Sequence, residues 1–224
     1  MNLPRWLALM ERLHLPPSQA TFDELERAYT ASDRHYHNDQ HIARCLAELD
    51  GAAPHIADPD PIELALWFHD AVYDTHSASN EVDSSQRAAD FLNGCKVDSS
   101  LTEIVVALVL ATRHQPGELT VSAQWMVDID LSSLGAEPGR WAADDRAIRQ
   151  EYAWVPEAIF REKRASILRG FLERSAIYGT DYFQERYEAQ ARANLAGSIL
   201  KLERILEIDR RADYLNEEMV DVLA

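Results

Sequence analysis

Residues 62–70 read Ile-Glu-Leu-Ala-Leu-Trp-Phe-His-Asp, an apolar run that ends in an adjacent histidine and aspartate. Apolar residues occupy nearly every position of the run, which favours a helix buried in the core. An imidazole and a carboxylate at its end are costly to bury unless another group compensates them, and a divalent cation can bind both. The pair His69-Asp70 therefore predicts a metal site with further ligands elsewhere in the chain.

Further candidate ligands are present on both sides of this run. Six of the eight histidines lie between residues 35 and 76, and they include His37 and His41. A second apolar stretch, residues 125–127, is followed by Asp128 and Asp130. Residues two apart on a regular helix diverge by about 200°, so we expect only one of these aspartates to face a given metal.

Three blocks of the sequence, in this order, resemble the metal-binding signature of the HD-domain phosphohydrolase superfamily. They are most similar to a bacterial branch of predicted metal-dependent HD-domain proteins whose substrate is poorly defined. The blocks are Arg-His-Tyr-His-Asn-Asp-Gln-His-Ile at 34–42, Trp-Phe-His-Asp-Ala-Val-Tyr-Asp at 67–74 and Asp-Ile-Asp-Leu-Ser-Ser-Leu-Gly at 128–135. The resemblance implies an all-α fold, a multi-helix HD-domain bundle with the metal site in the helical core.

The resemblance also implies a ligand set of His41, His69, Asp70 and Asp130. Asp130 with the leucine after it matches the final aspartate-leucine step of the family, which favours Asp130 over the alternative, Asp128. Two nitrogen and two carboxylate ligands suit one divalent ion of manganese, iron, zinc or cobalt, and magnesium is compatible if waters complete its shell. The sequence leaves the identity of the metal open.

Other polar residues near these blocks are candidates for catalysis. Asp74, four residues after Asp70, is predicted to orient the attacking water or protonate the leaving oxygen, and its alternative is a solvated loop acid. His37 is predicted either to contact a metal ligand from outside or to face the substrate. His114 is predicted to donate to a phosphoryl oxygen, or else to interact only with a helix dipole. Arg34 is a candidate phosphate clamp, because its planar fork suits bidentate contact.

Residues 69–75 are similar to a stretch of the guanosine tetraphosphate hydrolases of the same superfamily, which remove pyrophosphate with manganese. Tyr73 replaces their glutamate, whereas Asp74 occupies the matching place. The resemblance implies hydrolysis of a phosphomonoester or pyrophosphate bond in a nucleotide or another small phosphorylated metabolite. Two alternatives stay open: a metal-stabilised regulatory or binding module without turnover, and an oxygen-using di-iron enzyme with more ligands around one pocket.

The chain has 224 residues and is 46% hydrophobic, which is enough for one domain with a sizeable core. We expect a single HD-domain-like domain over 1–224, with the motifs in about 34–135 and helices of about 138–209 packing on this core. Aromatic residues of the last third are candidate buried anchors for that packing or for a homo-oligomer, namely Trp141, Tyr152, Trp154 and Phe160.

The net charge of −16 disfavours extended nucleic-acid binding but is compatible with a small phosphorylated substrate. Cys45 and Cys95 lack metal-ligand spacing and are typical of core thiols of a protein in a reducing compartment. No apolar run is long enough to cross a bilayer, so we expect a cytoplasmic protein without membrane contact.

Helical periodicity predicts an all-helical chain without strands. The helix over 100–114 contains the β-branched run 104–110, which also resembles a buried strand. Capping-box patterns place helix starts at Thr21, with Glu24, and at Ser100, with Glu103. The expected helices span about 2–13, 21–32, 38–49, 61–70, 80–93, 100–114, 122–134, 138–152, 156–173 and 181–209.

Overall fold

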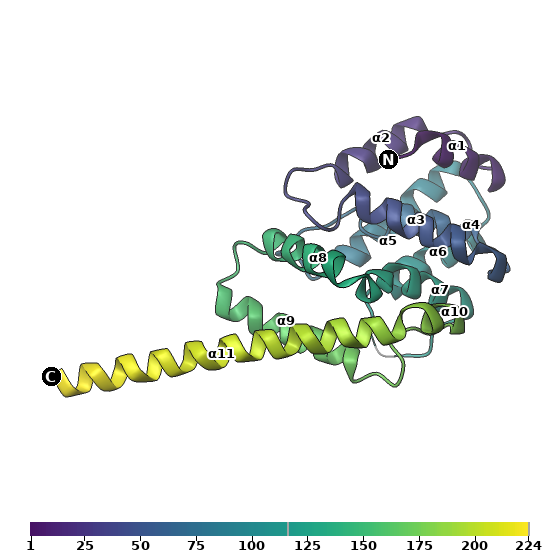
Figure 1. Ribbon diagram of the computed structural model, residues 1–224. Coiled ribbons are helices and arrows are strands. Elements are labelled where there is room, and N and C mark those ends of the chain that lie inside the picture. Colours follow the sequence, from purple (N-terminus) through teal and green to yellow (C-terminus); the bar gives the residue numbers. More distant parts are fainter. Residues whose placement is uncertain (116, 224) are drawn as a thin grey trace. The chain divides into compact units, whose positions relative to one another are not determined.

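The computed structural model describes residues 1–115 and 117–223, with side chains described up to residue 208. Every regular element in these residues is helical and none is a strand (Figure 1). This confirms the prediction of an all-helical chain. The contacts divide the chain into two compact units, which we describe separately: unit 1 comprises Met1–Ser133 and Tyr178–Phe183, and unit 2 comprises Leu134–Ile177 and Gln184–Ala224.

Unit 1 contains the helices that carry the three motif blocks. A short 3-10 helix follows the third helix at Ala53–His55. Another 3-10 segment, Leu131–Gly135, begins in unit 1 and ends in unit 2. The helices of this unit are α1 (Leu3–Arg12), α2 (Gln19–Tyr29), α3 (Asp39–Ala52), α4 (Asp60–Phe68), α5 (Asn80–Cys95), α6 (Ser99–Ala111), α7 (Val121–Asp130) and the short α10 (Asp181–Phe183).

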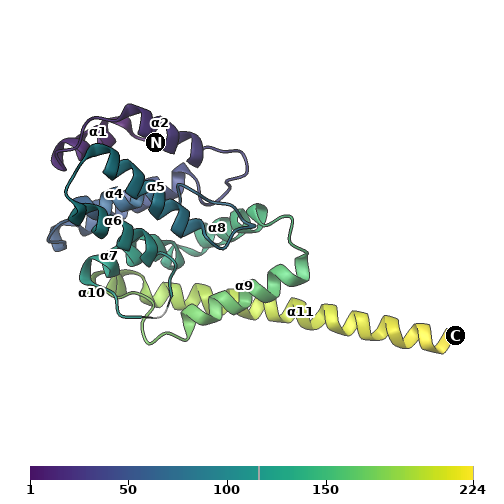
Figure 2. The same cartoon turned by 180° about the vertical axis from the view of Figure 1, so that it is seen from behind.

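Helix α4 forms the centre of unit 1. All of its residues from Pro61 to Phe68 are buried, as expected for a helix that is apolar on every side. It packs against α1, α3, α5, α6 and α7, and Figure 2 shows the arrangement from behind. The ring of Trp67 lies 5.7 Å from that of Trp6 and 6.1 Å from that of Phe22, so α4 also anchors the first two helices.

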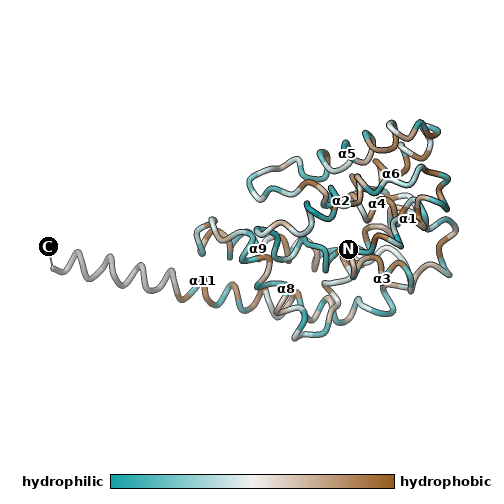
Figure 3. Tube along the Cα trace, turned by 90° about the horizontal axis from the view of Figure 1, so that it is seen from above, coloured by the Kyte–Doolittle hydropathy of each residue, from teal (hydrophilic) through white to brown (hydrophobic). Residues whose placement is uncertain are grey.

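The β-branched run 104–110 forms a helix, as predicted. It belongs to α6, whose residues Val105, Leu108 and Val109 are buried. Figure 3 shows hydrophobic stretches, in brown, in α4 and α6. In the described part of the chain, none of the helices combines the length and the apolar character needed to cross a membrane.

Two predicted helix starts are wrong by a few residues. Helix α2 is capped by Ser18, whose hydroxyl accepts a hydrogen bond from the backbone N–H of Thr21, so Thr21 lies inside the first turn. Helix α6 is capped by Asp98, which accepts from the N–H of Ser100. In both cases a suitable side-chain oxygen two or three residues earlier takes the capping position.

Unit 2 consists of α8 (Pro138–Glu151), α9 (Glu157–Leu172), a π-helical turn at Gln184–Glu188 and α11 (Ala189–Leu223), and α9 packs along α11. The helix predicted over 181–209 is thus divided by the π-turn and continues further than expected. Trp141 is buried and donates a hydrogen bond from Nε1 to Ser198 Oγ, at 2.9 Å. Trp154 is 52% exposed, so it is not the buried anchor that the sequence suggested.

Candidate metal centre

His41 enters the core of unit 1 from the first turn of α3. Asn38 caps this helix, and its side-chain oxygen accepts hydrogen bonds from the N–H groups of Gln40 and His41 at 3.0 and 3.3 Å. His41 is 3% exposed. The Cys45 thiol, one turn further along, lies 3.6 Å from His41 Nε2.

His69 and Asp70 follow the last residue of α4. The ring Nδ1 of His69 lies 2.9 Å from the carbonyl oxygen of Leu66. Because a carbonyl oxygen only accepts hydrogen bonds, Nδ1 carries a hydrogen, so Nε2 is the nitrogen that has the lone pair when the ring is neutral. The last turn of α4 therefore favours the tautomer that a metal ligand requires.

Asp128 and Asp130 lie in the last turn of α7 and face different surroundings. Asp128 is 1% exposed, and its carboxylate accepts hydrogen bonds from Gly179 N–H at 2.7 Å and from the N–H and hydroxyl of Thr180 at 2.8 and 2.6 Å. It thereby holds the segment that leads into α10. Asp130 points at the two histidines instead, which agrees with the divergence expected for residues two apart.

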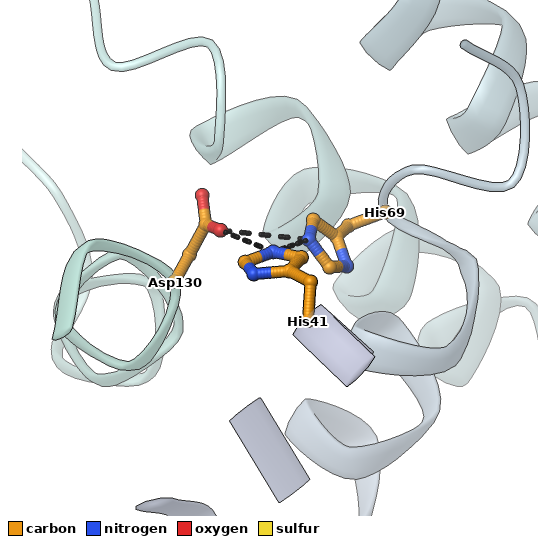
Figure 4. Close-up of side chains that lie close together, drawn as sticks. All are labelled: His41, His69 and Asp130. Atoms are coloured by element: carbon orange, nitrogen blue, oxygen red, sulfur yellow. Dashed lines mark hydrogen bonds and ion pairs between the residues drawn. The ribbon is translucent and has the colours of Figure 1, made fainter. Parts of the chain in front are cut away.

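His41, His69 and Asp130 form a group that could hold a metal ion (Figure 4). The two Nε2 atoms are 3.1 Å apart, and Asp130 Oδ1 lies 3.2 Å from that of His41 and 3.5 Å from that of His69. Asp70 adds a second carboxylate, because its Oδ2 lies 3.1 Å from His69 Nε2 and 3.7 Å from His41 Nε2. Four donor atoms from α3, the end of α4 and α7 thus converge.

These separations fit donors that share one cation. Ligand atoms about 2.1 Å from a metal lie roughly 3.0 Å apart at neighbouring octahedral positions and about 3.4 Å apart at tetrahedral ones. The five distances that involve a histidine Nε2, namely between the two rings and from each ring to the nearer oxygen of Asp70 and of Asp130, fall between 3.1 and 3.7 Å. The lone pair of His69 Nε2 and the two carboxylates also supply the donor types that such a metal needs.

The electrostatics of the group favour a bound cation. Burial lowers the pKa of His69, but Asp70 and Asp130 outweigh this effect and raise the pKa well above its usual value. Burial raises the pKa of both aspartates, yet the surrounding histidines bring the pKa of each below its ordinary range. The two carboxylates therefore attract positive charge, which in the metal-free protein is a proton on His69 and which a bound cation would replace.

His114 and His37 lie at the edge of the group. His114 follows α6 in the left-handed backbone region, with φ of 54°, and its Nε2 is 3.1 Å from Asp130 Oδ2. The ring of His37 stacks on Tyr73, with centroids 4.0 Å apart, and its charge is one of those that lower the pKa of Asp70. The structure therefore brings both histidines predicted from the sequence to the metal group.

Two other predicted site residues have different surroundings. The side chain of Asp74 is 62% exposed, and its carboxylate accepts a hydrogen bond from His76 N–H and pairs with the His76 ring. Arg34 directs its guanidinium at the carbonyl oxygens of His37, Asp70 and Ala71. The structure thus shows Asp74 as an exposed loop acid. Arg34 donates to the backbone, because the carbonyl groups after α4 have no partner within the helix and accept hydrogen bonds from its guanidinium.

Sequence reasoning missed two residues that touch the group. Tyr29 is fully buried; its hydroxyl donates to Trp67 O at 3.1 Å and accepts from Asp70 N–H at 3.2 Å. No sequence signal links Tyr29 to Asp70, which follows it by 41 residues. Cys45 is a buried thiol, as predicted. Its contact with His41 was missed, although a spacing of four residues on a predicted helix would have placed it beside that ring.

Comparisons with known proteins add no assignment. The chain matches no family model, no curated protein and no solved structure.

Proposed function

We propose that the chain is an HD-domain metal-dependent phosphohydrolase that acts on a nucleotide or another small phosphorylated metabolite. The observation that carries the proposal is the convergence of His41, His69 and Asp130, with Asp70 beside them, from three separate helical segments. The order of these residues in the chain supports the same assignment, since it resembles the superfamily signature.

The proposed chemistry requires a bound cation and side chains beside it that can transfer protons. A bound divalent cation would supply a Lewis acid that polarises a phosphoryl oxygen and lowers the pKa of water. His41 and His69 would bind it with neutral nitrogens, and Asp70 and Asp130 would neutralise its charge. His114, which contacts the outer oxygen of Asp130, and His37 would hold or move protons at the phosphoryl and leaving oxygens.

The exposure of these side chains supports a catalytic site over a closed structural one. The side chains of His41 and His69 are 4% and 1% exposed, whereas those of Asp70 and Asp130 are each 13% exposed and that of His114 is 20% exposed. The nitrogen ligands thus lie on the inner side, and the carboxylates and His114 on the side that solvent reaches. A substrate oxygen would approach from that second side.

A metal-stabilised binding module without turnover is the second candidate. The near-complete burial of His41 and His69 favours it, because structural metal sites are enclosed by protein. Hydrolysis of any phosphate ester by the metal-loaded protein would exclude this module.

Elemental analysis of the purified protein, followed by a phosphatase screen with each divalent metal restored, tests the proposal. Asp70→Ala is expected to lose the metal and all hydrolysis, because it removes an anionic ligand. Asp74→Asn is the matched control, since it changes an exposed carboxylate four residues later, and we expect its metal content and turnover to stay near wild type. Full metal content in Asp70→Ala would contradict the ligand set.

A further inference from the structure

The guanidinium of Arg34 connects two segments that carry metal ligands. Its Nη1 donates to the carbonyl oxygen of His37, which precedes α3, and to that of Asp70, which follows α4, at 3.1 and 2.5 Å. Its Nη2 donates to Ala71 O at 3.3 Å. The guanidinium therefore links the segment that precedes His41 to the segment that contains Asp70.

The surroundings of Arg34 hold this cation in one orientation. Its central carbon lies over the ring of Tyr29, 5.3 Å from the centroid, and over the ring of Tyr73, at 5.6 Å. Both aromatic faces attract the charge of the guanidinium. The Tyr29 hydroxyl also accepts from the N–H of Asp70, and Tyr73 stacks on His37, so the ring contacts reach the same two segments.

The hydrogen bonds of Arg34 are directed at backbone oxygens that lack helical partners. The carbonyl groups after the last turn of α4 have no partner within the helix, and a cation there also interacts favourably with the helix dipole. Three of the five N–H donors of the guanidinium are used on carbonyl oxygens, which leaves an incomplete fork for a phosphate. Arg34 thus contacts the backbone of Asp70 rather than a donor atom of the metal group.

We propose that Arg34 is a positioning residue that fixes the distance between the His41 and His69-Asp70 segments and so preorganises the metal group. This inference rests on the proposed metal site and assigns Arg34 a role different from substrate binding. Without the guanidinium, the carbonyl oxygens of His37 and Asp70 would bind water instead, and the two segments would lose the hydrogen bonds that link their backbones. The metal would then have to order its own ligands on binding, which lowers its affinity.

Arg87 provides a matched control. It donates to Ala71 O at 3.3 Å, as Arg34 does, and its other contact is with Glu24. It makes no hydrogen bond to Asp70 or His37 among those the structure describes. Arg87→Ala therefore removes a cation from the same carbonyl oxygen and leaves the link between the two ligand segments in place.

Cobalt(II) titration of the metal-free full chain, followed by visible absorption, tests the inference. We expect Arg34→Ala to weaken cobalt binding by about 10- to 100-fold, the usual range for a residue that supports a ligand, and to change the absorption bands. Arg87→Ala should keep the wild-type spectrum and bind cobalt within about twofold of wild type. Millimolar guanidinium, but not sodium chloride at equal ionic strength, should restore part of the affinity of Arg34→Ala.

Thermal unfolding of the metal-free variants separates this role from a purely structural one. Folded Arg34→Ala with wild-type cobalt affinity and spectrum would overturn the inference and leave the metal site intact. If wild-type protein bound no cobalt, both proposals would fail together. Should Arg34→Ala not fold, Arg34→Lys decides the question, because a single ammonium cannot span the three carbonyl oxygens. Reduced cobalt affinity in that variant supports the inference, and unchanged affinity overturns it.

Discussion

Asp128 and Asp130, both in the last turn of α7, contact different groups, and replacing each of them separately tests their different roles. Asp128 accepts three hydrogen bonds from Gly179 and Thr180, whereas Asp130 faces His41, His69 and His114. The first arrangement satisfies buried backbone N–H groups. The second places a negative charge among imidazoles, where it can bind a cation.

Asp128→Ala is expected to destabilise the metal-free protein by about 2–4 kcal/mol, because it leaves two backbone N–H groups and a hydroxyl without their charged acceptor. Its metal affinity should stay within a few-fold of wild type. Asp130→Ala should show the reverse pattern, with metal binding lost and a clearly smaller change in stability. Urea unfolding and metal titration of both variants measure the two effects. Loss of metal binding in Asp128→Ala alone would reverse the assignment of the two residues.

The metal group could be predicted from the sequence more fully than its surroundings. His69-Asp70 stood out because an apolar helix ends in two polar side chains, and the ordered blocks added His41 and Asp130. The contacts of Arg34 and Asp74 could not be predicted in this way, because they depend on which backbone carbonyl or neighbouring ring competes for each charged group. Tyr29 was missed for a related reason, since a buried tyrosine in an amphipathic helix is ordinarily part of the core.

At the scale of elements, α1 and α4 are joined by an ion-pair cluster on a buried acid. Glu63 of α4 accepts hydrogen bonds from Arg5 Nε at 2.7 Å and Arg12 Nη2 at 2.6 Å, and its side chain is only 7% exposed. Arg5 also pairs with Asp50 of α3, which is 62% exposed. Glu63 is thus the member of the cluster with the least access to water.

Glu63→Ala should destabilise unit 1 by roughly 1–3 kcal/mol, because it removes the buried acceptor that two arginines share, and water around Arg5 and Arg12 limits the loss. Asp50→Ala, which removes the exposed partner of Arg5, should cost less than about 1 kcal/mol. Denaturant unfolding at low and high salt measures both losses. Equal losses in the two variants would show that burial of Glu63 adds nothing to the cluster.

The elements themselves were largely predictable, and the errors have local causes. Helix periodicity located α3 to α9 because one face of each helix, or all faces of α4, must be buried. The start of α2 was placed at Thr21 instead of Ser18 because both hydroxyls can cap a helix, and the pattern with Glu24 favoured the later one. The π-turn before α11 was not predicted, because one extra residue in a single turn is too local a change to be located from a pattern that extends over a whole helix.

At the scale of the whole molecule, the net charge of −16 and the two carboxylates of the candidate metal group act in the same direction. The overall charge raises the local concentration of divalent cations and repels extended polyanions. In the proposed function, a small anionic substrate would therefore depend on the positive charge of a bound metal. We expect substrate binding, if the proposed function holds, to weaken when the metal is removed.

Metal binding should also stabilise the chain, and hydrogen exchange should show which helices hold the metal. A ligand at 100 times its dissociation constant contributes about 2.7 kcal/mol, which corresponds to a rise in Tm of roughly 5–10 °C for a unit of this size. Because the donors come from α3, the end of α4 and α7, amide hydrogen exchange should slow in those segments of unit 1 and stay unchanged in α9 of unit 2. Chelation should reverse both effects, and Asp130→Ala should show neither. A site built from these three segments would be contradicted if hydrogen exchange slowed equally in both units. It would also be contradicted if the metal left the Tm of the wild-type chain unchanged.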